Sequence, residues 1–187
     1  MSPAAASYIT GFALTKAGTS WTSPQVVGGV FAANNDPPTP TNLTVAIGDM
    51  QAAYTDAAGR KLPDFLNLSG GAIGGLTLTP GLYRWTSAVT IPSDITLTGG
   101  ADAVWIFQVT GNLKLSADQK MILSGGASPA NIFWQVGTSA TLGTTSVFKG
   151  TIMAMQSITL NTGATLMGKA LARNGGVTMA GNTIVEQ

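Results

Sequence analysis

The 187-residue sequence has no cysteine and no histidine, and only 9% of its residues are charged. Without cysteine, neither a disulfide nor a thiolate metal site can form. Without histidine, the commonest general base and the commonest metal ligand are both missing. We therefore predict no catalytic residue, no bound metal and no cofactor.

Charge of one sign and long hydrophobic runs are also lacking. The formal net charge is +1, with no run of like charges, so the sequence has no electrostatic footprint for nucleic acid. No uninterrupted apolar stretch of about 18 residues occurs, so we predict no membrane partner. Hydrophobic residues still make up 44% of the chain, which favours a folded domain over disorder. Threonine, serine, asparagine and glycine must therefore supply a neutral surface.

Internal repeats are the strongest pattern that is present. Thr141-Leu142-Gly143-Thr144 returns 18 positions later as Thr159-Leu160-Asn161-Thr162, and Ile106-Phe107-Gln108-Val109 returns after a longer interval as Phe133-Trp134-Gln135-Val136. The segments are short, rich in β-formers and separated by Gly, Asn or Ser, which predicts strands and turns. One unit is too short to bury its apolar side alone, so the copies are expected to stack into a β-solenoid.

Stacking predicts the interior and the corners of this solenoid. Two inward ladders are expected: Leu142, Leu160 and Met179, and Phe148, Leu166 and Ile184. Gly150 and Gly168 are expected at corners where φ is positive or backbones pass closely. Right-handed coils are expected, because parallel crossovers have that hand. A β-sandwich would also explain short strands, but it would not explain the 18-residue register.

One segment, about residues 40–58, departs from the repeat and predicts a long α-helix. Thr39 is expected at its N-cap, Pro40 at its first position and Gly59 at its end. Its apolar stripe should pack along one flank of the solenoid; the stripe consists of Leu43, Ile47, Met50, Tyr54 and Ala57. We expect residues 1–187 to form one domain.

Several spaced segments resemble the DUF3494-type ice-binding proteins, most closely the fungal and algal members. They are DMQAAY at 49–54, AAGR at 57–60, GGLTLTPGLY at 74–83, VWIFQV at 104–109, NIFWQVG at 131–137 and GKALA at 168–172. The resemblance implies a mainly β fold, an irregular right-handed β-helix with three faces and a flanking α-helix. It also implies a secreted protein that binds ice through one flat β-face. Family members usually carry a further segment before the Ser-Pro found here at Ser2-Pro3. We therefore expect one end of the coil stack to be uncovered. The protein is expected to be a monomer that can associate through this end.

Within this resemblance, Thr162-Gly163-Ala164-Thr165 matches a Thr-Gly/Ala-x-Thr pattern of family ice faces. Stacked coils repeat about every 4.7–4.9 Å, near an oxygen repeat of hexagonal ice. The stiff threonine side chain offers a methyl group and a hydroxyl that anchors ordered water. The predicted ice-binding residues, aligned coil by coil, are Thr22, Ser93, Asp94, Lys120, Thr144, Val147, Thr162, Thr165, Asn182 and Thr183.

Two other classes of function are alternatives to ice binding. A β-helix lyase or hydrolase needs clustered carboxylates, whereas Asp94, Asp102 and Asp118 are predicted at separate turns. An adhesin or carbohydrate-binding module needs exposed aromatic side chains. We expect Trp105 and Trp134 in the core or against the helix, and we expect Trp21 and Trp85 to be the candidates for exposure. Asn42 and Asn67 begin N-glycosylation sequons.

Overall fold

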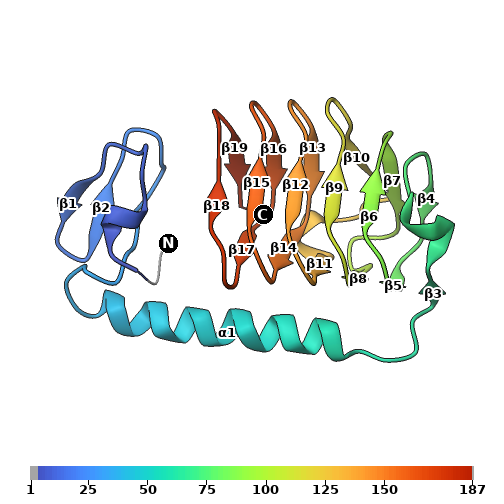
Figure 1. Ribbon diagram of the computed structural model, residues 1–187, viewed down its shortest axis with the longest axis horizontal. Helices are drawn as coiled ribbons and strands as arrows, with labels where there is room; N and C mark the ends of the chain where they lie inside the picture. Colours follow the sequence, from blue (N-terminus) through green and yellow to red (C-terminus); the bar gives the residue numbers. More distant parts are fainter. Residues whose placement is uncertain (1–3, 187) are drawn as a thin grey trace. The chain divides into compact units, whose positions relative to one another are not determined.

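Residues 54–186 consist mainly of parallel strands that stack coil on coil. The computed structural model describes residues 4–186, which form two compact units, residues 4–53 and residues 54–186. In the second unit the coils lie side by side, and every coil after the first adds one strand to each face (Figure 1). The predicted β-helix of parallel strands is confirmed, and α1 (Thr39–Gly59) is the one long helix among the described residues.

Three faces surround the interior of the stack. The helix-side face is a six-stranded sheet of β3 (Phe65–Leu66), β5 (Gly81–Trp85), β8 (Trp105–Val109), β11 (Ile132–Val136), β14 (Thr151–Ala154) and β17 (Ala170–Ala172). The five-strand face consists of β6 (Val89–Ile91), β9 (Leu113–Leu115), β12 (Ala140–Leu142), β15 (Ile158–Leu160) and β18 (Val177–Thr178). The split face consists of two three-stranded sheets, β4 (Thr77–Leu78), β7 (Ile95–Thr98) and β10 (Met121–Ser124), then β13 (Val147–Lys149), β16 (Thr165–Met167) and β19 (Thr183–Val185). Short 3-10 turns lie at Leu68–Gly71 (η2) and Pro129–Asn131 (η3).

The strand register follows the sequence repeats. Leu142 pairs with Leu160, and Phe148 pairs with Leu166, which pairs in turn with Ile184. The longer upstream interval also gives aligned strands, because β8 and β11 pair along their full length. Met179 follows the end of β18 and is 38% exposed, so the third rung of the leucine ladder is not buried. A repeat period that varies therefore still produces a continuous stack.

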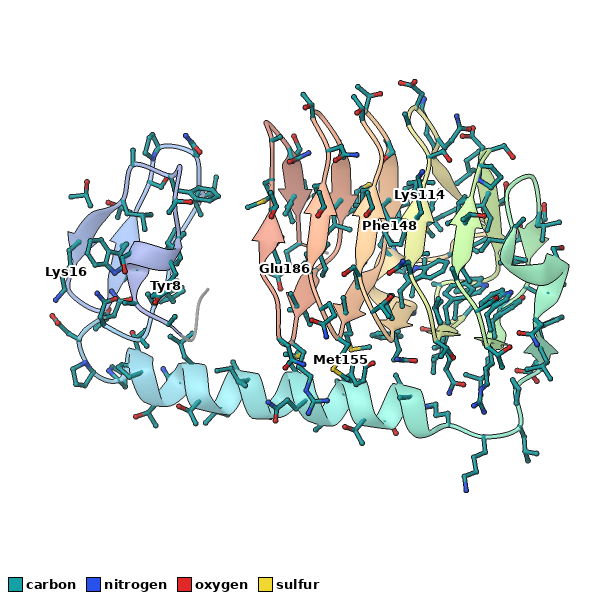
Figure 2. The ribbon with its side chains drawn as sticks, viewed as in Figure 1. Tyr8, Lys16, Lys114, Phe148, Met155 and Glu186 are labelled. Atoms are coloured by element: carbon teal, nitrogen blue, oxygen red, sulfur yellow. The ribbon has the colours of Figure 1, made fainter. Side chains whose placement is uncertain are left out.

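Aromatic side chains fill the interior behind the helix-side face. Rings from successive coils stack on one another, with centroids 4.3 Å apart for Phe65 and Tyr83 and 3.8 Å apart for Phe107 and Trp134. Phe148 lies inside the same stack (Figure 2). Such pairs add about 0.5–1.5 kcal/mol beyond the burial of their area.

The four tryptophans divide differently from the prediction. Trp105 and Trp134 are fully buried, as predicted. Trp85 is also fully buried, and its indole nitrogen donates to the Leu68 carbonyl at 2.9 Å, so its expected exposure is wrong. The cause is strand alternation: Tyr83 and Trp85 share the inward side of β5, and the exposed Arg84 lies between them. Trp21 is half-buried.

The last turns of α1 pack on the outer side of the helix-side face. Tyr54 and Ala57 form a cluster with Met153, which is 3% exposed, and Met155 lies at this cluster (Figure 2). Two glutamines of the sheet hydrogen-bond to the helix end. The Gln135 amide donates to the Tyr54 hydroxyl at 2.8 Å, and the Gln108 amide donates to the carbonyls of Ala57 and Arg60 at 2.7 and 2.8 Å. The two Gln108 bonds satisfy carbonyls at and just beyond the C-terminal end of the helix.

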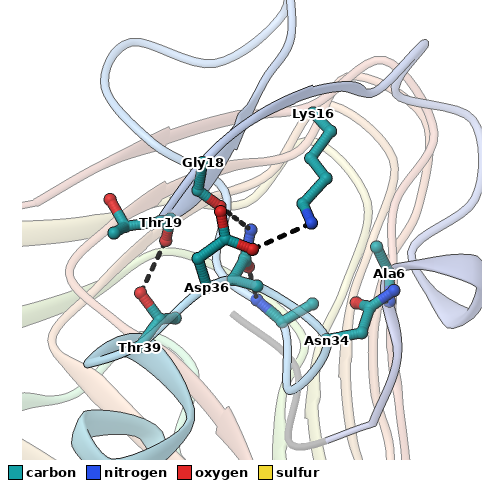
Figure 3. Close-up of polar contacts among 9 residues, drawn as sticks. Ala6, Lys16, Gly18, Thr19, Asn34, Asp36 and Thr39 are labelled. Carbon is teal, nitrogen blue, oxygen red and sulfur yellow. Dashed lines mark hydrogen bonds and ion pairs between the residues drawn. The ribbon is translucent and has the colours of Figure 1, made fainter.

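Residues 4–53 have a different architecture. A 3-10 turn, η1 (Ala6–Tyr8), precedes an antiparallel hairpin of β1 (Thr15–Ala17) and β2 (Ser20–Thr22). Polar contacts join the hairpin to the start of α1 (Figure 3). Lys16 pairs with Asp36 at 3.0 Å, and the hydroxyl of Thr39 donates to the Thr19 carbonyl at 2.5 Å. Thr39 is thus the first residue of α1 and also its link to the hairpin.

Glycine corners set the closeness of the coils, and Gly168 is the tightest. Its φ is +146°, and a Cβ at this position would lie 2.2 Å from the Gly150 carbonyl oxygen of the preceding coil. Gly168→Ala is therefore expected to lower the free energy of unfolding by about 2–4 kcal/mol. Thermal unfolding followed by circular dichroism measures this change.

Gly100→Ala is the matched control, because no atom lies within 4 Å of its Cβ position and its φ is not positive. This control should unfold close to the wild-type temperature. Equal melting temperatures for Gly168→Ala and the wild type would contradict the close approach of the two coils.

Candidate functional site

Five of the predicted residues form one row on the split face. Lys120 bridges to Val147, Val147 pairs with Thr165, and Thr165 pairs with Thr183. Asp94 precedes Ile95 as Lys120 precedes Met121, and Ile95 and Met121 are paired, so Asp94 occupies the next position of this row. The structure thus brings together residues that lie up to 89 positions apart in the chain.

Other predicted residues lie in the corner between the five-strand face and the split face. Thr144 follows β12 and Thr162 follows β15, and both are exposed. Gly163 turns the chain with a φ of +71°, and Ala164 is fully buried. The buried alanine fixes the local orientation, so Thr162 and Thr165 both stand on the outer surface on either side of it.

The hydroxyls of Thr144, Thr162, Thr165 and Thr183 have no hydrogen-bond partner among the residues that the structure describes. Elsewhere threonine hydroxyls bind the protein itself: Thr110, for example, donates to the Trp85 carbonyl at 2.9 Å. Because Thr is β-branched, its free hydroxyl is already held in few orientations. The row and its corner therefore present ordered hydroxyls to the surrounding water.

Two predicted residues are engaged in the turns themselves. The Asn182 amide donates to the carbonyls of Asn161 and Ala164 at 2.7 and 3.1 Å, which ties the last coil to the one before it. An Asp94 carboxylate oxygen accepts the backbone N–H of Lys120 at 2.7 Å. Both side chains hold neighbouring coils in register. Their hydrogen bonds therefore stabilise the shape of the split face.

Thr22 does not lie in the coil stack, and its predicted alignment with the stacked residues is wrong. It ends β2, pairs with Thr15 across an antiparallel hairpin and belongs to residues 4–53. Its hydroxyl donates to the Thr15 carbonyl at 3.4 Å. Ser93 lies in the turn between β6 and β7.

Charge on these surfaces is sparse and local. Asp94 and Lys120 are the charged members of the split-face row, and no group of three or more potential metal ligands occurs among the described residues. An exposed pair, Lys169 and Glu186, joins at 2.9 Å, and this bond lowers the pKa of Glu186. None of the helices in the described part of the chain is long and apolar enough to cross a membrane.

A second row, which was not predicted from the sequence, lies on the five-strand face. Its outward residues, in coil order, are Thr90, Lys114, Thr141, Thr159 and Thr178. The signal was present: buried Ile158 and Leu160 flank Thr159, and this alternation places the threonine outside. The same alternation holds in β6, β9 and β12.

Comparison with known proteins agrees with this architecture. Residues 1–185 match the ice-binding-like protein family. The chain belongs to this family. An ice-binding protein of Leucosporidium sp. is 46% identical over 175 residues, which cover 92% of this chain and 67% of that protein. One of Flavobacterium frigoris is 52% identical over 144 residues, which cover 77% of this chain and 52% of that protein.

Solved structures of this family share the fold. The ice-binding protein LeIBP from an Arctic yeast, whose structure was related to its antifreeze activity, superposes with a TM-score of 0.95 at 43% identity. The match covers 97% of this chain and 79% of that one. An ice-binding domain of Shewanella frigidimarina superposes with a TM-score of 0.84 at 26% identity, covering 95% of this chain and 80% of the other.

The structural role of Asn182 gives a prediction. Asn182→Ala removes both amide bonds to the preceding coil, at about 0.5–1.5 kcal/mol each, so we expect the free energy of unfolding to fall by about 1–3 kcal/mol. The control is Thr183→Val, which replaces the neighbouring threonine by a side chain of the same shape and should leave the free energy of unfolding nearly unchanged. Thermal melts of both variants test the prediction. If Asn182→Ala melts at the wild-type temperature, Asn182 does not stabilise the contact between the two coils.

Proposed function

We propose that this chain adsorbs to ice through the split face and the corner beside it, without catalysis. Membership of the ice-binding-like family is the observation that carries the proposal. The relatives named above are called ice-binding proteins, and the chain spans about half to two thirds of the length of those two. The split-face row and the free corner hydroxyls supply a surface on which ice can be bound.

The physical basis is a rigid, nearly neutral array. Backbone hydrogen bonds fix neighbouring coils about 4.8 Å apart, so Val147, Thr165 and Thr183 repeat at that interval. Threonine methyl groups discourage disordered hydration, while hydroxyls anchor water that bridges to the crystal. Because the face is ordered beforehand, docking costs little side-chain entropy. We place the protein outside the cell as a monomer, where ice forms.

The rival function as a carbohydrate-binding module is not supported by the tryptophans of the coil stack. Sugar stacking needs an exposed aromatic ring, and Trp85, Trp105 and Trp134 are fully buried. Their rings instead hold the coils together. The observed burial therefore favours ice over a glycan.

The purified chain is expected to shape ice crystals, to give measurable thermal hysteresis and to inhibit recrystallisation. A nanolitre osmometer measures the first two effects across a dilution series. Unfaceted discs without a hysteresis gap at every concentration would refute ice binding by this chain.

Thr165→Tyr and Thr162→Tyr test the position of the face. A bulky ring on a flat surface holds ice away from the neighbouring residues, so each change should strongly reduce hysteresis. A change on the outer surface should alter the free energy of unfolding by only about 0.5 kcal/mol. Thr41→Tyr, on the exposed side of α1, is the matched control and should keep full activity. If both face variants are as active as the wild type and melt alike, ice binds elsewhere.

A further inference from the structure

One turn of the coil stack, residues 173–176, combines an exposed asparagine with a glycine that the packing requires. The turn joins β17 on the helix-side face to β18 on the five-strand face. Asn174 is the only asparagine of the sequence that a glycine follows, and both residues are exposed. A Cβ at Gly175 would lie 2.7 Å from the backbone nitrogen of Ser157 in the preceding coil. The close approach of the two coils therefore leaves room only for glycine after Asn174.

A glycine after an asparagine removes the main steric barrier to a reaction within the chain. The backbone nitrogen of the second residue can attack the amide carbon of the asparagine side chain, and a five-membered imide ring forms. Any side chain on the second residue crowds this ring, whereas glycine leaves it open and also lets the backbone rotate into the reactive geometry. Asparagine is for such reasons among the thermolabile residues. The reaction further requires that the attacking nitrogen is not held in a hydrogen bond.

The backbone nitrogen of Gly175 meets this requirement, since it has no hydrogen-bond partner among the residues that the structure describes. The two preceding nitrogens are paired with the neighbouring coil. The Arg173 N–H donates to the Ala154 carbonyl at 2.9 Å, and the Asn174 N–H donates to the Met155 carbonyl at 3.0 Å. Pairing between the coils thus holds the asparagine in place and stops immediately before the nucleophile.

Other asparagines of the coil stack lack this combination. The backbone nitrogens of Leu113 and Thr183, which follow Asn112 and Asn182, donate to carbonyls of adjacent coils at 3.0 and 3.3 Å. The side-chain oxygen of Asn67 accepts a backbone N–H of the next coil at 2.9 Å, so its amide group is held away from the following nitrogen. Hydrogen bonding between coils therefore protects these asparagines.

We propose that Asn174 is a site of spontaneous deamidation, a modification that does not depend on ice binding. The Gly175 nitrogen loses its proton and bonds to Cγ of Asn174, and the amide nitrogen leaves with that proton as ammonia. One water molecule then opens the imide ring at either of its two carbonyl carbons. The product is an aspartyl or an isoaspartyl residue at position 174, and each form adds one negative charge. The reaction needs only water as a co-reactant.

The isoaspartyl product alters the backbone between β17 and β18. Its main chain runs through the former side chain, which inserts one methylene group into the turn. Because β18 is held to β15 by a short pairing that begins at Val177 and Ile158, the longer turn loosens this coil. The bond from the Asn174 amide to the sulfur of Met155, at 3.4 Å, is lost as well. We expect the isoaspartyl form to unfold at a lower temperature than the unmodified chain.

Ageing of the purified chain at neutral and mildly alkaline pH tests the site. Peptide mapping by mass spectrometry should find an amide replaced by a carboxylate at Asn174 first, while Asn112 and Asn182 stay intact. The rate should rise with pH, because the attacking nitrogen must lose its proton. A methyltransferase specific for isoaspartyl residues should label the aged protein. Asn174→Gln is the matched control, because Gln156 occupies the aligned position of the preceding coil and glutamine would have to form a larger ring.

The same chain denatured in guanidinium gives the reference rate. A site that reacts only after global unfolding would be slower in the folded chain by a factor of roughly 10³ or more. We expect the folded rate at Asn174 to lie within about tenfold of the denatured rate, because the turn is exposed and its nitrogen is free. An Asn174 that stays amidated in the folded chain, or labelling of aged Asn174→Gln equal to that of the wild type, overturns the proposal.

Asn174→Asp separates the effect of the new charge from that of the altered backbone. This variant carries the charge on an ordinary main chain and should melt close to the fresh wild type, because position 174 is exposed. Aged wild-type protein rich in isoaspartate should melt below both. If aged and fresh protein melt at the same temperature, the modification does not loosen the coil and this part of the proposal is wrong.

Discussion

Hydrogen bonding between parallel strands of successive coils is the interaction on which the rest of this structure depends. It fixes the distance from one coil to the next, whatever the length of the chain that connects them. The aromatic stack inside and the threonine rows outside are two consequences of this one spacing. Phe107 and Trp134 lie ring on ring because β8 and β11 are paired, and Thr141 lies beside Thr159 because β12 and β15 are paired.

Each face uses the common spacing for a different purpose. The helix-side face places apolar residues on both of its sides, so that rings fill the interior while Met153 meets Tyr54 of the helix. The five-strand face is apolar on the inside and carries Thr90, Lys114, Thr141, Thr159 and Thr178 outside. The outer side of the split face is mixed, because threonines stand there beside exposed Ile122 and Val185. The low overall charge of the chain is therefore also found on these outer faces. Their neutral hydroxyl groups, in place of charged groups, bind the surrounding water.

Much of this architecture could be predicted because repeats make distant contacts local in the sequence. Once Phe148 is aligned with Leu166, the partner of every residue in the coil follows, and the row from Asp94 to Thr183 was found in this way. The helix was predicted from its stripe, whose members Leu43, Tyr54 and Ala57 are buried. Outside the repeats this alignment is not possible. The hairpin that contains Thr22 has no second copy in the sequence, so its strand partners could not be predicted.

Errors arose where a pattern from the family was preferred to the alternation of individual strands. The Thr-Gly-Ala-Thr segment drew attention to one face, while the simpler in-and-out pattern of Ile158-Thr159-Leu160 identified a second row. Trp85 was predicted to be exposed, although its neighbour Arg84 already occupies the outward position of β5. Asn182 shows a different limit. Its amide binds carbonyls of the preceding coil, and only coordinates distinguish such a brace from a surface contact.

The unequal coil lengths have a consequence for how such a surface can change. Strands β8 and β11 begin 27 residues apart, whereas β13 and β16 begin 18 apart, yet both pairs align without a shift. The additional residues are taken up between the paired strands. Insertions there leave the paired strands undisturbed, and a whole 18-residue coil is a unit that can be duplicated. Duplication of one coil would lengthen the outer faces by about 4.8 Å. The area of these faces can therefore change without a change in the residue types that they carry.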